Sequence, residues 1–211
     1  MAMFYKKNNP PDFEIGIWDI TEPEAWFLER LPLNDAEQKQ LANIKGHRRL
    51  EWLASRYLMS EMLGAKSGAL TKDEFGKPFL AHLPLFISLS HSHGLAAAII
   101  AKPVCGIDIQ KLVPKIDRIA HRVLRPEELD SLEAETRMEH LHVYWGAKES
   151  LYKAYGRREL DFCTHIQVEP FSFDLERGYC EGRVVKNNYD EAFYIHYQMI
   201  GSFVLVYVLK K

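Results

Sequence analysis

The sequence predicts an α+β fold of two similar lobes with antiparallel sheets, and three observations support this prediction. Helix-like and strand-like segments follow one another along the 211 residues in the order helix, sheet, helix, sheet. The strand-like segments stand too close together for the crossover helices that parallel strands need, so neighbouring strands should pair antiparallel. The length suits one large domain or two small ones, and we expect an N-terminal lobe over 1–106 and a C-terminal lobe over 107–211.

The first half of the chain opens with Phe13 to Trp18, whose alternation predicts a short strand. Two short helices should follow, one over Glu22 to Leu31 and one that Asn34 caps. His47 to Leu63 is the clearest helix of this half, because its apolar residues recur at helical spacing and Gly64 stands where a C-terminal cap belongs.

Three short strands are predicted in the middle of the chain, separated by turn residues: Phe86–Ser90, Leu95–Ala101 and Val104–Gln110. Helices return over residues 115–155 in three pieces, of which the second begins near Pro126 and the last covers Arg137 to Tyr155. Four further strand-like segments follow: His165–Glu169, Tyr179–Val185, Ala192–Met199 and Phe203–Leu209.

Composition and charge exclude several classes of protein. A hydrophobic content of 47% with 27% charged residues is typical of a globular protein. The 27 basic and 29 acidic residues give a net charge of −2, whereas a protein that binds a nucleic-acid backbone by charge is normally basic. The longest apolar runs have 7 residues, far fewer than the ~18 that span a bilayer. The 3 cysteines lack metal-ligand spacing. We expect a cytoplasmic monomer that binds neither nucleic acid nor a membrane.

The segment V-C-G-I-D-I-Q at 104–110 is the first candidate site. In a strand, Gly106, Asp108 and Gln110 share one face. Two oxygen-bearing side chains beside a glycine suit a hard cation, although any strand with one polar face gives the same pattern.

The second candidate is W-G-A-K-E-S-L-Y-K at 145–153. On a helix, Trp145, Glu149 and Lys153 stack on one face and Lys148 lies on the adjoining flank. A surface Glu149–Lys153 pair is the ordinary explanation. The aromatic neighbours predict a covered helix instead, in which a carboxylate needs a partner.

The third candidate combines G-K-P at 76–78 with I-S-L-S-H-S at 87–92. Ser90 and His91 offer neutral donors and Lys77 a positive charge, a set that suits a phosphate group. A serine–histidine pair also occurs in hydrolases, but the sequence contains no G-x-S-x-G turn. Arg49 and Arg56 lie beside the apolar stripe of the helix over 47–63. A solvent-exposed flank with buried side-chain stems is the ordinary explanation for such a pair.

Taken together, these motifs resemble the 4′-phosphopantetheinyl transferases, and specifically the two-lobed Sfp-like group. The resemblance rests on G-I-D, W-x-x-K-E-S-x-x-K and the upstream G-K-P and S-H-S, in that family's order. It implies the fold of that family. It also implies Mg²⁺-dependent transfer of the 4′-phosphopantetheine arm of coenzyme A to a serine hydroxyl of an apo acyl or peptidyl carrier protein, with release of 3′,5′-ADP.

The resemblance also implies roles for particular residues. Mg²⁺, or Mn²⁺ in its place, would bind Asp108 and Glu149, and Glu149 or a water-linked group would be the base. Lys148 and Lys153 would bind the pyrophosphate. The coenzyme A site would include Lys77, Pro78, Ser90 and His91, with Arg49 and Arg56 as candidates for the 3′-phosphate. Members of this group often carry glutamate where this chain has Gln110, so Gln110 either ligates the metal through its carbonyl or leaves the place to water, with weaker metal affinity.

A basic stripe follows the strand that carries Asp108, and its members include Lys115, Arg118 and Arg122. A solvated helix face is the ordinary explanation. If the chain is a transferase, the stripe would attract the acidic surface of a carrier protein. Two other readings stay open, a non-catalytic homologue that binds coenzyme A or a carrier protein and a metal-dependent phosphoesterase.

Overall fold

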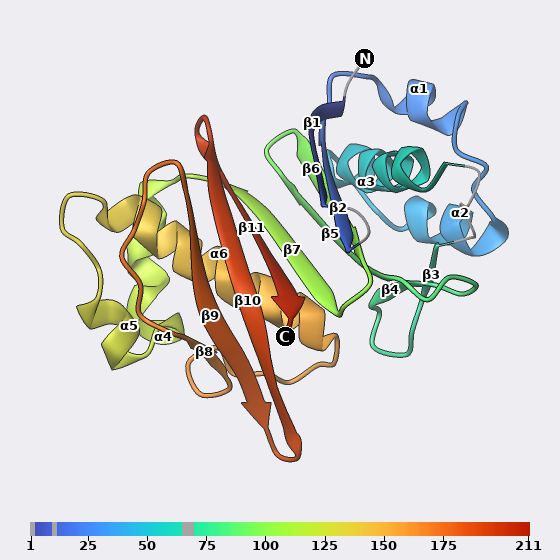
Figure 1. The fold of residues 1–211 in the computed structure, drawn as a ribbon. Helices are drawn as coiled ribbons and strands as arrows, with labels where there is room; N and C mark the ends of the chain where they lie inside the picture. Colours follow the sequence, from blue (N-terminus) through green and yellow to red (C-terminus); the bar gives the residue numbers. More distant parts are fainter. Residues whose placement is uncertain (1–2, 10–11, 65–69) are drawn as a thin grey trace.

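Two antiparallel sheets and the helices packed on them make up the computed structural model, which describes residues 3–9, 12–64 and 70–211 (Figure 1). The first sheet has the order β1-β2-β6-β5, with the bounds Met3–Asn9, Phe13–Asp19, Leu95–Ala101 and Phe86–Ser92. The second has the order β7-β11-β10-β9-β8, with the bounds Cys105–Lys111, Phe203–Lys210, Tyr189–Ile200, Arg177–Lys186 and Ile166–Val168. The strands in both sheets pair antiparallel, which confirms the predicted α+β class.

Helix α3 (Arg48–Leu63) packs on the first sheet, against β2, β5 and β6. Its apolar stripe is the one predicted from the sequence, and Leu53 and Leu58 in it are fully buried. Gly16 of β2 lets the helix approach closely, because a Cβ at that position would lie 2.9 Å from a methyl carbon of Leu58. The helix therefore holds its polar flank beside the end of β5.

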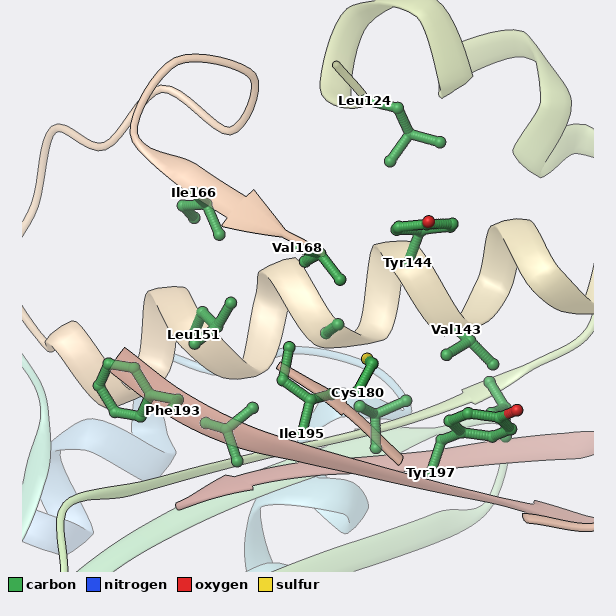
Figure 2. Close-up of a cluster of buried hydrophobic side chains, with 14 of the residues drawn as sticks. Leu124, Val143, Tyr144, Leu151, Ile166, Val168, Cys180, Phe193, Ile195 and Tyr197 are labelled. Atoms are coloured by element: carbon green, nitrogen blue, oxygen red, sulfur yellow. The ribbon is translucent and has the colours of Figure 1, made fainter. Parts of the chain in front are cut away.

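Helix α6 (Arg137–Tyr155) lies against the second sheet, between its strands and the segment that carries Leu124 (Figure 2). It approaches β7 so closely that a Cβ on Gly106 would lie 1.9 Å from the backbone oxygen of Ser150. Only glycine fits there. The G-I-D motif thus has a packing reason for its glycine, and this contact places Asp108 beside the helix that carries Glu149.

The two lobes meet along β5 and β7. The backbone N–H groups of Ile107, Ile109 and Lys111 in β7 donate to the hydroxyls of Ser88, Ser90 and Ser92 in β5, at 3.1, 3.2 and 3.3 Å. We call these three serines the serine row. Behind it, apolar side chains of β2 and β6 pack against those of β7 and β11. The serine row therefore provides side-chain hydrogen-bond acceptors along one edge of β7, in place of the backbone carbonyls that a neighbouring strand would provide.

Short elements complete the chain. The first lobe also holds α1 (Glu24–Leu28), α2 (Asp35–Ala42) and the hairpin of β3 (Leu70–Lys72) with β4 (Pro78–Leu80). The second lobe holds the 3₁₀ helix η2 (Pro114–Ile119), α4 (Ala120–Val123) and α5 (Pro126–Asp130). In the part of the chain that the structure describes, no helix is long and apolar enough to cross a membrane.

Candidate functional site

A cavity of about 460 Å³ lies between the lobes, bordered by α3, the β3–β4 hairpin, β5 and the C-terminal end of α6. Its walls carry six lysines and arginines together with His91: Arg56, Lys72, Lys77, Lys153, Arg157 and Arg158. None of the described lining residues is an aspartate or a glutamate. A concave site with charge of one sign favours a ligand of the opposite sign, so this cavity is built for an anion.

Asp108 and Lys153 form the polar cluster at the lobe junction. The Oδ1 atom of Asp108 accepts hydrogen bonds from Lys153 Nζ and from Ser90 Oγ, both at 2.8 Å. Lys153 also donates to the backbone oxygen of Ile107 at 2.9 Å. The cluster draws one residue from β5, one from β7 and one from α6. It brings together three of the residues predicted from the sequence.

Glu149 lies one helical turn before Lys153 on α6. Burial raises the pKa of its carboxyl, and the negative charge of Asp108 raises it further, while Lys153 opposes both effects. Among the described residues Glu149 has no hydrogen-bond partner and no ion-pair partner. The negative charges of Asp108 and Glu149 thus repel each other, and the positive charge of Lys153 offsets this repulsion only in part.

The donor set at this point fits a magnesium ion. The described residues contain no group of three or more His, Cys, Asp or Glu side chains that could hold a metal. Mg²⁺ does not need such a group, because it usually binds one or two carboxylates and completes its shell with water and substrate phosphate oxygens. Asp108 and Glu149 offer the two carboxylates, next to a cavity that suits phosphate.

Gln110 is tied to α6. Its Nε2 donates to the backbone oxygen of His142 at 3.0 Å, and its Oε1 pairs with His142 Nδ1 at 3.0 Å. The other ring nitrogen of His142, Nε2, lies 2.9 Å from the backbone nitrogen of Val113 and 3.1 Å from its backbone oxygen. The carbonyl that the sequence offered as a metal ligand is therefore already engaged, and the geometry favours the reading in which water takes that place.

His91 lies on the cavity wall and pairs with a carboxylate that is not part of the lining. Its Nδ1 lies 3.0 Å from Glu51 Oε2, and Glu51 is a buried residue of α3 that the sequence did not single out. Burial lowers the pKa of His91, while the negative charge of Glu51 opposes this effect. Glu51 thus holds the Nδ1 side of the imidazole in place.

Lys77 and Pro78 lie where the β3–β4 hairpin meets α6. Lys77 Nζ donates to the backbone oxygen of Ala154 at 2.7 Å, in the last turn of the helix. Gly156, with a φ of +72°, leaves room for the lysine chain, because a Cβ there would lie 2.3 Å from Lys77 Cδ. Both predicted residues line the cavity, and Lys77 also links the two lobes.

Lys148 corrects the sequence-based assignment. Its side chain is 0% exposed and its Nζ lies 2.8 Å from Glu128 Oε2. The same ammonium donates to the backbone oxygens of Phe162 and Ile166 at 2.9 and 2.7 Å. It therefore lies outside the cavity wall, with its donors already used. A structural role for Lys148 replaces the predicted pyrophosphate contact.

The two arginines predicted for a phosphate differ in their position relative to the cavity. Arg49 pairs with Glu24 at 2.6 Å, bonds the backbone oxygen of Leu41 and is absent from the cavity wall. Arg56 does reach the cavity, but only 8% of it is exposed, with its guanidinium 3.3 Å from the ring centre of Trp52. Burial lowers the pKa of Arg56 to about 10. Arg49 thus braces two helices, and Arg56 forms part of the floor.

Sequence reasoning missed three cations of the wall, namely Lys72, Arg157 and Arg158. Arg157 and Arg158 could have been selected from the sequence, because they directly follow Gly156 at the end of the helix that carries Lys153. The basic stripe lies outside this cavity: Lys115, Arg118 and Arg122 are exposed on η2 and α4.

Comparisons with known proteins identify the family to which the chain is similar. Residues 104–207 match a family model described as the 4′-phosphopantetheinyl transferase superfamily, and residues 36–101 match one described as the 4′-phosphopantetheinyl transferase N-terminal domain. A 4′-phosphopantetheinyl transferase of Bacillus subtilis is 35% identical over 89 residues, 40% of this chain and 39% of that protein. The 4′-phosphopantetheinyl transferase AcpT of Salmonella typhimurium is 33% identical over 119 residues, 53% of this chain and 62% of that protein. The chain thus spans less than two thirds of either relative.

Proposed function

The chain belongs to the 4′-phosphopantetheinyl transferase superfamily, and on this premise we propose that it transfers the 4′-phosphopantetheine arm of coenzyme A to a serine hydroxyl of an apo acyl or peptidyl carrier protein. The observation that carries the proposal is the cationic cavity, which ends beside Asp108 and Lys153. None of the described residues in its wall is a carboxylate. Coenzyme A has the matching form, with three phosphates at one end. We also propose the two-lobed Sfp-like group, with lobes over 1–106 and 107–211.

In the proposed reaction, the serine oxygen attacks the phosphorus atom that bears the pantetheine arm. A new phosphorus–oxygen bond forms, the bond to the second phosphate breaks, and 3′,5′-ADP leaves with the electron pair. Lys153 stands where it stabilises the charge that develops on the leaving phosphate. Glu149, whose pKa is raised by burial and by Asp108, accepts the serine proton directly or through water.

Asp108 and Glu149 would hold Mg²⁺, or Mn²⁺ in its place. When bound, the ion neutralises negative charge on the diphosphate oxygens. Ser90 and Lys153 keep Asp108 in one orientation through their bonds to Oδ1. Gln110 supports this arrangement from the side, by binding β7 to α6 through His142.

A mass measurement tests the proposal. The protein is incubated with coenzyme A, magnesium and an apo carrier protein, and the carrier is weighed. A gain of one phosphopantetheine supports the transferase. An unmodified carrier with coenzyme A bound to the protein would favour a non-catalytic binding homologue, and breakdown of coenzyme A without transfer would favour a phosphoesterase. Glu149→Gln should abolish the mass gain, while Glu191→Gln, a matched change on distant β10, should not.

A further inference from the structure

His142 is a buried side chain of α6 that takes no direct part in the proposed reaction. Only 1% of it is exposed, and it does not belong to the described cavity wall. Its Nδ1 lies 3.0 Å from Gln110 Oε1, at the end of β7. Its Nε2 lies 2.9 Å from the backbone nitrogen and 3.1 Å from the backbone oxygen of Val113, at the start of η2. The two sides of one ring thus contact two different parts of the chain.

The contact with Gln110 involves more than the ring. Gln110 Nε2 also donates to the backbone oxygen of His142 at 3.0 Å, so both polar atoms of the amide bond α6. The amide lies beside Gly146, about one turn further along the helix, where a Cβ would lie 3.0 Å from Gln110 Nε2 and 2.7 Å from Val206 Cγ2. The glycine of W-G-A-K-E-S therefore leaves the space in which this amide is held.

This contact is one of two fixed points between β7 and α6. At the other, a Cβ on Gly106 would lie 1.9 Å from a backbone oxygen of the helix, so strand and helix touch there. On the strand, Asp108 lies between Gly106 and Gln110. On the helix, Glu149 follows His142 by about two turns and lies on the same side. The spacing of the two carboxylates therefore depends on both fixed points.

The contact with Val113 concerns the next element of the chain. Val113 precedes Pro114, the first residue of η2, and η2 continues into α4. These two short helices carry the basic stripe. Helices of this length have few internal hydrogen bonds, so their direction depends on how the chain enters them. The ring of His142 fixes this entry, together with the Leu112 N–H, which donates to the backbone oxygen of Ser202 at 2.9 Å.

We propose that His142 is a positioning residue that orients two parts of the site with one ring. Through Gln110 it sets the spacing of Asp108 and Glu149, and through Val113 it sets the direction of the basic stripe. The inference rests on the proposed function, in which a carrier protein docks on the stripe while its serine reacts beside the two carboxylates. A fixed relation between docking surface and reactive groups places the serine oxygen correctly in more of the encounters.

Two substitutions at His142 each remove one contact and keep the other. The amide nitrogen of asparagine is as many bonds from Cβ as Nδ1 is, so His142→Asn can still bond Gln110 but does not reach Val113. The amide of glutamine extends as far as Nε2, so His142→Gln can still bond Val113 but loses Gln110. His142→Phe keeps an aromatic ring of similar shape and loses both contacts.

Metal binding measures the contact with Gln110. In the presence of coenzyme A, His142→Gln should bind Mn²⁺ about tenfold more weakly, because changes to residues that support metal ligands cost about 10- to 100-fold in affinity. His142→Asn should stay within about twofold of wild type. Electron paramagnetic resonance of free Mn²⁺ gives these affinities without any turnover.

Carrier kinetics and amide exchange measure the contact with Val113. His142→Asn should raise the KM for the carrier about 2- to 5-fold with little change in kcat, since exposed charge pairs each contribute little to binding. His142→Gln should instead lower kcat and leave this KM near that of wild type. Hydrogen exchange over residues 112–123 should be faster in His142→Asn than in His142→Gln, and this measurement requires neither metal nor carrier.

The opposite responses of the two variants distinguish positioning from plain structural support. Equal losses of metal affinity and carrier binding in both variants would overturn the proposal, as would unchanged metal affinity and exchange in His142→Phe. His82→Asn and His82→Gln make the same changes at an exposed histidine outside the cavity wall and should alter neither property. Wild-type protein that modifies no carrier would overturn the proposed function. Equal exchange rates in the two His142 variants would overturn this inference whether or not the carrier is modified.

Discussion

At the scale of single residues, His140 is the clearest departure from ordinary chemistry. It is fully buried in α6, stacked on Tyr144 and Phe173 at ring distances of 5.1 and 5.4 Å. Neither ring nitrogen has a hydrogen-bond partner in the described part of the chain. Burial lowers its pKa to about 4, although the negative charge of Glu133 opposes the shift. The protein thus holds a neutral imidazole inside an aromatic cluster.

We therefore expect stability to fall in acid. The folded-state pKa of His140 lies below that of the unfolded chain, so the unfolded state takes up the proton first. The contribution is complete above about pH 6.5 and decreases as the pH falls towards 4, by up to about 3 kcal/mol. Urea denaturation at pH 7.5 and 5.0 measures this difference. His140→Phe should reduce the pH dependence, whereas the exposed control His121→Phe should leave it unchanged; equal slopes for wild type and His140→Phe would contradict the prediction.

Gln110 carries a second prediction at this scale. A glutamate at that position adds a negative charge two residues from Asp108 on the same face of β7. Gln110→Glu should therefore bind Mg²⁺ or Mn²⁺ about tenfold more tightly, because affinity rises with the charge of the oxygen ligands. Metal titration in the presence of coenzyme A measures the change. Gln38→Glu, which adds the same charge on α2, serves as the control. Identical metal affinity in the Gln110 variant would refute our interpretation of this residue.

At the scale of elements, the buried pair of Lys148 and Glu128 fastens α5 and β8 to α6. Glu128 accepts from the backbone N–H groups of Arg125 and Val168 as well, at 2.8 and 2.9 Å. Both side chains are 0% exposed. A pair of this kind matters mainly for what happens when one member is lost, because the other is then a buried charge without a partner.

Single and double variants distinguish this role from a catalytic one. Lys148→Met alone should lower the free energy of unfolding by about 3–5 kcal/mol. Lys148→Met combined with Glu128→Leu should recover part of that loss, since no charge is stranded. Chemical denaturation gives the three free energies. The folded double variant should still bind coenzyme A with an affinity near that of wild type; a strong loss of binding without loss of stability would restore Lys148 to the phosphate site.

The elements also show how far sequence reasoning reaches. Helix α3 and helix α6 were predictable, because their apolar residues recur at helical spacing over several turns. Strand β1 was missed, since M-F-Y-K-K-N-N lacks the apolar alternation of a buried strand and lies at the sheet edge. The two strands of the β3–β4 hairpin were not predicted, because strands of three residues carry almost no pattern.

At the scale of the whole molecule, the site depends on contacts between the lobes. Asp108, Lys153, Ser90 and His91 could be selected from the sequence because short motifs carry them. Which lysine faces the cavity could not be selected, since the partner of Lys148 lies on another element. The predicted phosphate contact of Arg49 fails for the same reason, because its partner Glu24 lies on another helix, 25 positions earlier in the sequence. Periodicity describes one element at a time, and a cavity between lobes is a property of several.

The basic stripe leads to a prediction at this scale. Arg118 and Arg122 are exposed, outside the cavity wall, on the segment that follows β7. The combined change Arg118→Glu/Arg122→Glu should weaken binding of an acidic carrier protein at least about tenfold, because repulsion replaces attraction. Coenzyme A affinity should not change. Surface plasmon resonance at two salt concentrations measures the carrier, and titration measures the cofactor. Equal losses for both ligands would indicate misfolding instead.

The serine row has a consequence for any attempt to divide this protein. One edge of β7 finds its acceptors in hydroxyls that belong to the other half of the chain. A fragment cut between residues 101 and 105 would present that edge bare, next to apolar side chains that β2 and β6 had covered. Bare strand edges recruit further strands. We therefore expect the isolated C-terminal fragment to self-associate, and co-expression of both fragments to suppress this aggregation.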